Sequence, residues 1–233
     1  MAAGAPTLFI PAKKKLLNGG FNLSADALKA CVVQAAQGFN PGWLGASGDA
    51  RYADLTQEFT SAQTGYTAGG QAIAGVALSY FVASAAIAAP GTGGTTGAQT
   101  VTGTTGAGVK AQVPVTVSGG AITAIAGVPS VGGAYTTLPT NPGAEPVTGG
   151  GLTGAQLQLT MGVALAFTSP TWNPISTVGS TGAKYLVVYD NTQANKDLLF
   201  WADFEVLLAN GLQFGPGGVL TWNPNAAGVL QLN

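Results

Sequence analysis

Carboxylates cluster in one stretch of the chain, which contains Asp190, Asp197, Asp203 and Glu205. Asp203 and Glu205 are two residues apart, so on a strand they would share one face, as a pair of carboxylates for glycoside cleavage could. Carboxylates that flank a strand are more often solvated, and no other motif in the sequence supports glycoside cleavage. The pattern therefore predicts that the protein is not an enzyme.

The sequence contains no histidine and a single cysteine, Cys31. Without histidine, a general base near neutral pH would have to be a carboxylate or a lysine with a strongly shifted pKa. Zinc is nearly excluded as well, because its usual ligands are cysteine and histidine. Cys31 has no partner for an internal disulfide, and its apolar neighbours in ALKACVVQ predict a core side chain, with a reactive thiol as the alternative.

Other ligand-binding patterns are incomplete. The segment DNTQANKD (190–197) offers oxygen ligands but lacks the glycine and the terminal glutamate of an EF-hand loop. Glycine runs such as 149–151 do not belong to a phosphate-binding loop pattern. We therefore expect no cofactor and no bound metal.

Large apolar side chains are the better candidates for function. The four tryptophans could stack on sugars, but such residues are more often core or subunit-contact anchors. The motif TWNP occurs twice and predicts an aromatic anchor followed by a turn out of a strand. The apolar start of the chain predicts an extended arm that orders on assembly. The candidate assembly contacts are Leu8, Phe9, Ile10, Trp43, Trp172 and Trp222.

Composition limits the class of protein. Only 7% of residues are charged, against about 25% in ordinary globular proteins. Glycine accounts for 36 of the 233 residues, hydrophobic residues for 46%, and the net charge is −1. Disorder is not expected, because it combines low hydrophobicity with high net charge. Many short strands joined by turns are expected instead, in a protein that associates with copies of itself.

Nucleic acid and membrane partners are not expected. The eight Lys and Arg residues are scattered and the pI is near 5.1. Residues 72–89 carry no charge, but they are rich in alanine, lack a cationic flank and alternate like a strand. The first basic run, KKK, follows apolar residues instead of preceding them, so we expect no export signal.

Local patterns predict several elements. The stretch AKKKLLNGG predicts a short helix ended by glycine, and SADALKACVVQA favours a strand over a helix. Residues 38–59 predict a loop with a short helix near 52–59. Ser118-Gly119-Gly120 predicts the turn of a tight hairpin, and KYLVVYD, apolar on both faces, predicts a central strand. A polar turn and the strand LLFWADFEVLL follow.

A composition change marks a possible insertion. Residues 91–160 contain two charged residues, Lys110 and Glu145, and are about half Gly and Thr. We expect a mainly β protein, with an antiparallel β-sandwich or barrel-like framework (20–90 plus 161–233), one or two short helices and an N-terminal arm (1–23). A small Gly/Thr-rich β-module (91–160) is expected to be inserted in a surface loop of the framework.

Two parts of the sequence resemble bacteriophage proteins. The early AKKKLLNGGFNLSADALKACVV, with the late KYLVVYDNT, LLFWADFE and GLQFGPGGVLTWNPNAAGVLQL, resembles a family of small virion proteins of tailed phages. The run VSGGAITAIAGVPSVGGAYTTLPT is similar to a Gly-rich β-module of phage structural proteins. Together the two resemblances cover most of the chain, and they offer no catalytic residues.

The resemblance implies a virion component, made in the host cytoplasm, that works by contact. A capsid decoration protein is expected, with the major capsid protein or other virion proteins as partners. A homo-oligomer is expected, with a trimer favoured among cyclic arrangements. The alternative is a tail-tip or fibre-associated protein that contacts host surface glycans.

Overall fold

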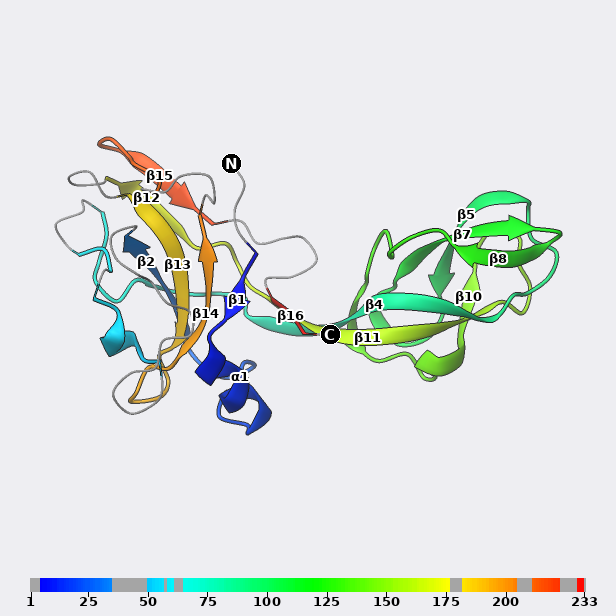
Figure 1. The fold of residues 1–233 in the computed structure, drawn as a ribbon, viewed down its shortest axis with the longest axis horizontal. Helices are drawn as coiled ribbons and strands as arrows, with labels where there is room; N and C mark the ends of the chain where they lie inside the picture. Colours follow the sequence, from blue (N-terminus) through cyan, green and yellow to red (C-terminus); the bar gives the residue numbers. More distant parts are fainter. Residues whose placement is uncertain are drawn as a thin grey trace. The chain divides into compact units, whose positions relative to one another are not determined.

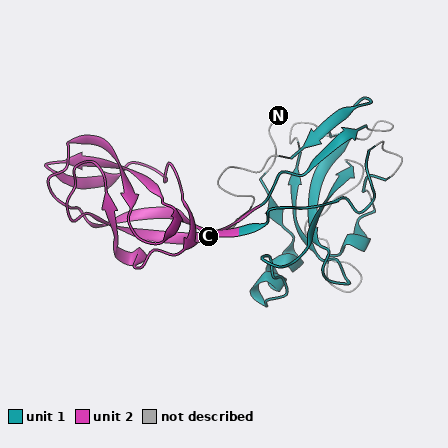
Figure 2. Ribbon diagram, turned by 180° about the vertical axis from the view of Figure 1, so that it is seen from behind, with its two compact units in different colours: residues 1–77, 167–224 teal, residues 78–166, 225–233 magenta. Residues whose placement is uncertain are grey.

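The computed structural model describes residues 5–34, 50–56, 58–60, 65–176, 182–204, 211–222 and 230–232. The protein is mainly β, with antiparallel sheets and one α-helix in the described residues, as predicted. It divides into two compact units (Figure 2). Unit 1 contains Met1–Ala77 and Phe167–Pro224, and unit 2 contains Leu78–Ala166 and Asn225–Asn233.

Unit 1 is built on a five-stranded sheet whose centre is β13 (Ala183–Asp190), as its two apolar faces predict (Figure 1). On one side of β13 lie β14 (Leu198–Asp203) and the short edge strand β1 (Thr7–Leu8). On the other side lie β2 (Leu28–Gln34) and β3 (Gln71–Ala72). The strand interpretation of residues 28–34 is therefore confirmed.

A second, two-stranded sheet packs against the first through aromatic side chains. It pairs β12 (Thr171–Ile175) with β15 (Gly218–Thr221). The two TWNP motifs meet here, because Thr171 is the register partner of Thr221. The ring of Trp222 lies 6.3 Å from that of Phe200 on β14, so the arrangement is sandwich-like.

The helix α1 (Ile10–Leu17) follows β1 and begins with Pro11 in its first turn, where proline is tolerated. It ends before Gly19, whose φ of +69° is left-handed, as the sequence predicts. The helix expected near residues 52–59 is shorter than predicted. It is a single 3-10 turn, Tyr52–Asp54, because Glu58 pairs with Val33 in an antiparallel bridge and extends the chain.

Unit 2 contains one sheet whose strands follow the order β6-β9-β4-β11-β10-β5-β7-β8, with β16 beside β11. Their bounds are β4 Ala77–Ala89, β5 Gly97–Gly103, β6 Ala107–Val109, β7 Gln112–Ser118, β8 Ala121–Ile125, β9 Ala134–Thr137, β10 Glu145–Thr148, β11 Gln156–Ala166 and β16 Leu230–Leu232. A 3-10 turn, Pro142–Ala144, precedes β10. The unit extends beyond the composition-based limits 91–160, because β4 and β11 pair with each other.

The predicted hairpin is present in unit 2. Ser118 pairs with Ala121, which leaves Gly119 and Gly120 as a two-residue turn with φ of +60° and +82°. Positive φ at both positions is the requirement of a type I′ turn. Alternate residues of β7, Val113, Val115 and Val117, are buried in the core of the unit.

The approach of Gly70 to β2 provides a test of the unit 1 fold. A Cβ at Gly70 would lie 1.9 Å from the carbonyl oxygen of Ala30, whereas one at Gly19 would meet nothing within 4 Å, and both residues have positive φ. We expect Gly70→Ala to lower the free energy of unfolding of unit 1 by about 3 kcal/mol, and Gly19→Ala by about 1 kcal/mol. Urea unfolding followed by tryptophan fluorescence measures both, because all four tryptophans belong to unit 1. Equal losses would contradict the close approach.

Candidate functional site

Unit 2 contains two charged side chains, Lys110 and Glu145, and the structure places both on the same turn. Glu145 is fully buried at the start of β10. Its Oε1 accepts hydrogen bonds from the backbone N–H groups of Thr104 and Thr105, each at 2.7 Å. Its Oε2 accepts the hydroxyl of Thr105. The carboxylate thus accepts hydrogen bonds from the N–H and hydroxyl groups of the turn that connects β5 to β6.

Lys110 binds the carbonyl groups of that turn. Its Nζ donates to the carbonyl oxygens of Thr105 and Gly106, and it lies 5.8 Å from the centroid of the Tyr135 ring. The hydroxyl of Tyr135 accepts the backbone N–H of Ala111 at 2.9 Å. Both charged side chains of unit 2 therefore form hydrogen bonds within the unit. The remaining surface of unit 2 carries no charged side chain.

The uncharged surface of unit 2 has apolar and hydroxyl-bearing regions. The exposed large apolar side chains include Val109, Val128, Val131 and Leu138. Val109 and Val131 lie on adjoining segments of the chain, because Val109 pairs with Ala134 and Val131 forms a bridge with Gln112. We call Val109 and Val131, with the loop Ala126–Gly133 between β8 and β9, the apolar edge.

The outer face of the same sheet is polar without charge. Thr102 of β5 is the register partner of both Gln112 on β7 and Thr148 on β10. The alternate residues Val101, Val113 and Val147 point into the core instead. The strands therefore present hydroxyl and carboxamide groups outward, over an apolar core.

Most of the predicted assembly contacts are core residues of unit 1, which corrects the sequence-based interpretation of them as assembly contacts. Leu8, Phe9, Trp172 and Trp222 are all buried. Within the expected arm, Thr7 and Leu8 form a strand that pairs with β14 of the same chain. The two tryptophans pack on aromatic rings, Trp172 on Tyr66 and Trp222 on Phe167 and Phe200.

Two exposed apolar residues remain on α1. Ile10 is 60% exposed, so of the predicted contacts in the described residues it alone presents a surface. Leu17, seven residues later on the same helical face, is 87% exposed and was not predicted. Trp43 lies outside the described residues.

Two acidic residues of the stretch considered for glycoside cleavage form ion pairs with lysines. Asp203 binds Lys184 at 2.8 Å, and Asp197 binds Lys15 of α1 at 2.6 Å. Glu205 lies outside the described residues, so the structure describes no Asp203–Glu205 pair.

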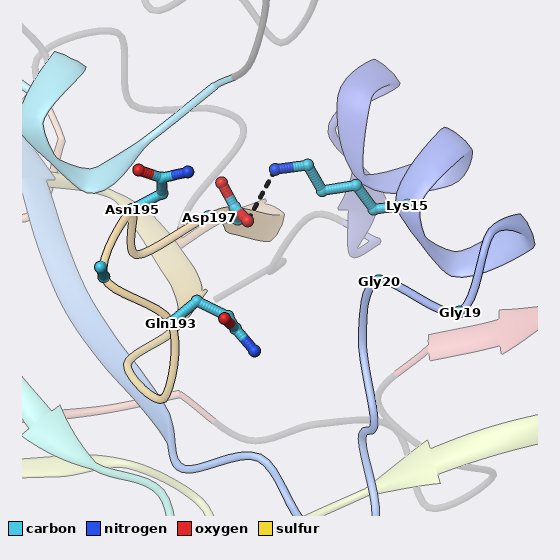
Figure 3. Close-up of a pocket in the computed structure, with 7 residues that line it drawn as sticks. Lys15, Gly19, Gly20, Gln193, Asn195 and Asp197 are labelled. Carbon is cyan, nitrogen blue, oxygen red and sulfur yellow. Dashed lines mark ion pairs between the residues drawn. The ribbon is translucent and has the colours of Figure 1, made fainter.

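A polar pocket lies between the end of α1 and the turn that joins β13 to β14 (Figure 3). Its volume is about 430 Å³, and its lining includes Lys15, Gln193, Asn195 and Asp197. The ion pair between Lys15 and Asp197 lies within it, and Gln193 and Asn195 come from the turn just before Asp197. Among the described residues that line the pocket, none has an aromatic side chain on which a sugar could stack.

A cluster of tyrosines in unit 1 was not predicted from the sequence. Glu58 accepts hydrogen bonds from the hydroxyls of Tyr52 and Tyr66 and from the backbone N–H of Gly69. Tyr189 stacks on Tyr52 at 4.7 Å and donates to the Gly69 carbonyl oxygen. Burial raises the pKa of all three tyrosines, and the charge of Glu58 raises each further.

The contacts of the tyrosine cluster indicate that its role is structural. Each hydroxyl has a partner within the unit, and the hydroxyl of Tyr66 also accepts the N–H of Val32 on β2. Cys31 on the same strand is buried, and burial raises the pKa of its thiol, which opposes thiolate formation. Cys31 is therefore the core side chain that the sequence predicts.

No family model, curated protein or solved structure matches the chain. Within the described residues, no helix has the length and apolar character of a membrane span. The same residues contain no group of three or more Cys, Asp or Glu side chains placed to bind a metal.

The role of Glu145 can be tested by substitution. We expect Glu145→Ala to lower the free energy of unfolding of unit 2 by about 3 kcal/mol, because the N–H and the hydroxyl of Thr105 lose their acceptor and the Thr104 N–H keeps only its bond to the Pro146 carbonyl oxygen. Calorimetry should show a lower transition for unit 2, while the transition seen by tryptophan fluorescence stays unchanged. Thr123→Ala, which removes an exposed hydroxyl of the same unit, is the control. An unchanged unit 2 transition in Glu145→Ala would contradict the assignment.

Proposed function

We propose that this chain is a bacteriophage virion structural protein that decorates the capsid exterior through subunit contacts and catalyses no reaction. The observation that carries the proposal is the surface of unit 2, which has no charged side chain beyond the internally bonded Lys110 and Glu145. The sequence resemblance to tailed-phage virion proteins supports the virion setting.

An uncharged surface suits lasting contact. The centre of a protein interface is depleted of charged residues, because a charge buried there loses its hydration and must find a partner. Unit 2 imposes no such cost on a neighbour, and its exposed valines add apolar area. Net charge near zero also removes the repulsion between copies.

We propose two kinds of partner. Other copies of this chain associate with unit 2, as a homo-oligomer that we propose to be a trimer. The major capsid protein or another virion protein meets unit 1, where α1 exposes Ile10 and Leu17 beside the lysines Lys13 and Lys14. Such a helix face fits an acidic surface with an apolar pocket.

A second candidate function is supported by the hydroxyl and carboxamide groups on the outer face of unit 2. Thr102, Gln112 and Thr148 are neighbours there and could hydrogen-bond to glycans of the host surface. This arrangement would place the chain at the tail tip or on a fibre.

Self-association can be tested by adding charge to the apolar edge. Val109 is 57% exposed and Val131 38% exposed in unit 2, and Val219 is 51% exposed in unit 1. We expect Val109→Lys with Val131→Lys to weaken self-association of the full chain by about tenfold or more, because the new charges would be desolvated. Sedimentation velocity over a range of concentrations measures it. Val219→Lys should associate as the unmodified chain does, and equal weakening in that control would contradict a contact through unit 2.

Quantitative mass spectrometry of purified particles tests the virion assignment. A decoration protein should be present in hundreds of copies, in a constant ratio to the major coat protein, and its removal should lower the melting temperature of the capsid. A few copies per particle, with lost host adsorption and unchanged capsid stability, would favour the tail alternative. Absence from particles would contradict both.

A further inference from the structure

Two buried aspartates lie opposite each other where β13 and β14 meet the turn that connects them. Asp190 donates its backbone N–H to the Asp197 carbonyl oxygen at 2.9 Å, which continues the register of Tyr189 with Leu198. Residues that face each other across antiparallel strands project on the same side of the sheet, with Cβ atoms about 4.5–5.5 Å apart. The two carboxyl groups are therefore neighbours on one face.

Each of these carboxyl groups has one oxygen without a hydrogen-bond partner. Asp190 is fully buried, and Asp197 is 6% exposed. Oδ1 of Asp190 accepts the backbone N–H of Thr192 at 2.7 Å. In the described part of the chain, Oδ2 of Asp190 and Oδ1 of Asp197 are buried and accept no hydrogen bond. One proton shared between the two carboxyl groups would give each of these oxygens a partner.

Lys15 of α1 reaches the same pair of acids. Its Nζ lies 2.6 Å from Oδ2 of Asp197, and the two side chains are 21% and 8% exposed. Because a C–O bond is about 1.2 Å long, Nζ lies within about 4 Å of the Asp197 carboxyl carbon. Reacting atoms in a near-attack geometry are about 3–3.5 Å apart. The amine and the carboxyl carbon are therefore close to the separation at which they could react.

The charges of this cluster balance only with a bound proton. One ammonium group faces two carboxylates, and an excess charge is costly where water is largely excluded. Arg51 forms an antiparallel bridge with Asp197, but among the described residues its side chain forms no ion pair with either acid. A proton on the pair leaves one neutral carboxyl group beside the lysine, which is the form that an amine can attack.

We propose that Lys15 and Asp197 form an intramolecular isopeptide bond, with Asp190 as the proton carrier. The shared proton resides on Asp197, the Asp190 carboxylate accepts a proton from the Lys15 ammonium, and the freed electron pair of Nζ attacks Cγ of Asp197. Asp190 returns this proton to the Asp197 hydroxyl, which leaves as water when the C–O bond breaks. Asp190 then accepts the second proton from the nitrogen. The products are an amide, one water molecule and a neutral Asp190, so atoms and charge balance without another reactant.

The surroundings favour the product. The ammonium and the carboxylate disappear together, so the site no longer contains a buried charge. The pocket of about 430 Å³, whose lining includes both Lys15 and Asp197, gives the released water a way out (Figure 3). The amide would join α1 covalently to the turn between β13 and β14. This inference is independent of the proposed virion function, because the reaction takes place within unit 1 and requires no partner.

A second ion pair in unit 1 lacks this arrangement and provides an internal control. Nζ of Lys184 lies 2.8 Å from Oδ2 of Asp203. The residue opposite Asp203 on β13 is Tyr185, which is not an acid that could hold and transfer the proton. We therefore expect the isopeptide bond at Lys15 and not at Lys184.

Mass spectrometry of the full chain, unfolded in guanidinium chloride so that only covalent bonds persist, tests the proposal. The intact mass should be lower than the sequence mass by one water molecule. Tryptic digestion should release a branched peptide in which residues 15–29 are joined to residues 197–233, because trypsin does not cleave after a modified lysine. A chain without the water loss, with Lys15 and Asp197 in separate peptides, overturns the proposal.

Variants identify the residues that react. Lys15→Arg and Asp197→Ala should each have the full mass and give no branched peptide, whereas Lys184→Arg should keep the loss of water. Asp190→Ala should form the bond at least about 100-fold more slowly, because proton transfer by a positioned group contributes roughly 10²–10⁴-fold. Water loss that persists in Lys15→Arg, or an unchanged rate in Asp190→Ala, contradicts the assigned roles. The branched peptide is sought in the unmodified chain, so the test remains decisive if a variant fails to fold.

Discussion

The bonds of Glu145 are the interaction on which unit 2 depends. In the turn between β5 and β6, the buried carboxylate of Glu145 accepts the backbone N–H groups of Thr104 and Thr105, and the Thr104 N–H also donates to the Pro146 carbonyl oxygen of β10. The Thr105 hydroxyl, which donates to the same carboxylate, accepts the N–H of Thr140 and so joins a second loop to the first. With Lys110 on the carbonyl side of the turn, the two charges of the unit hold its loops and leave none for its surface. The chemistry of the outer face is therefore set by Thr, Gln, Ala and Val.

Unit 1 has the opposite distribution of charge. Lys15 and Asp197 connect the helix to the sheet, Lys184 and Asp203 connect neighbouring strands, and Glu58 connects three aromatic or backbone donors. Against this background Asp190 stands out, because the described residues give its buried carboxylate neither a basic partner nor a full set of hydrogen-bond donors.

Local sequence patterns predicted the elements better than the site. The hairpin at Gly119-Gly120, the central strand β13 and the helix end at Gly19 all follow from backbone requirements of a few adjacent residues. The burial of Phe9 and Trp222 could not be predicted in this way, because it depends on strands distant in sequence, β14 above all. The same holds for Glu58, whose partners Tyr52, Tyr66 and Gly69 are brought together by the bridge to β2. The pairing of Lys110 and Glu145 around one turn had a visible sign, since they are the only charges in a long neutral segment.

The contrast between the units constrains how the chain could act. Ion pairs stabilise unit 1 internally and are weakened by salt where they are exposed, whereas contacts of unit 2 depend on apolar area and neutral hydrogen bonds. Association through unit 2 would then persist at high ionic strength, and recognition through the lysines of α1 would not. If the proposed partners are correct, attraction to an acidic surface would depend on the charges of α1, and attachment between copies would not. The two units would then contribute to assembly by different forces.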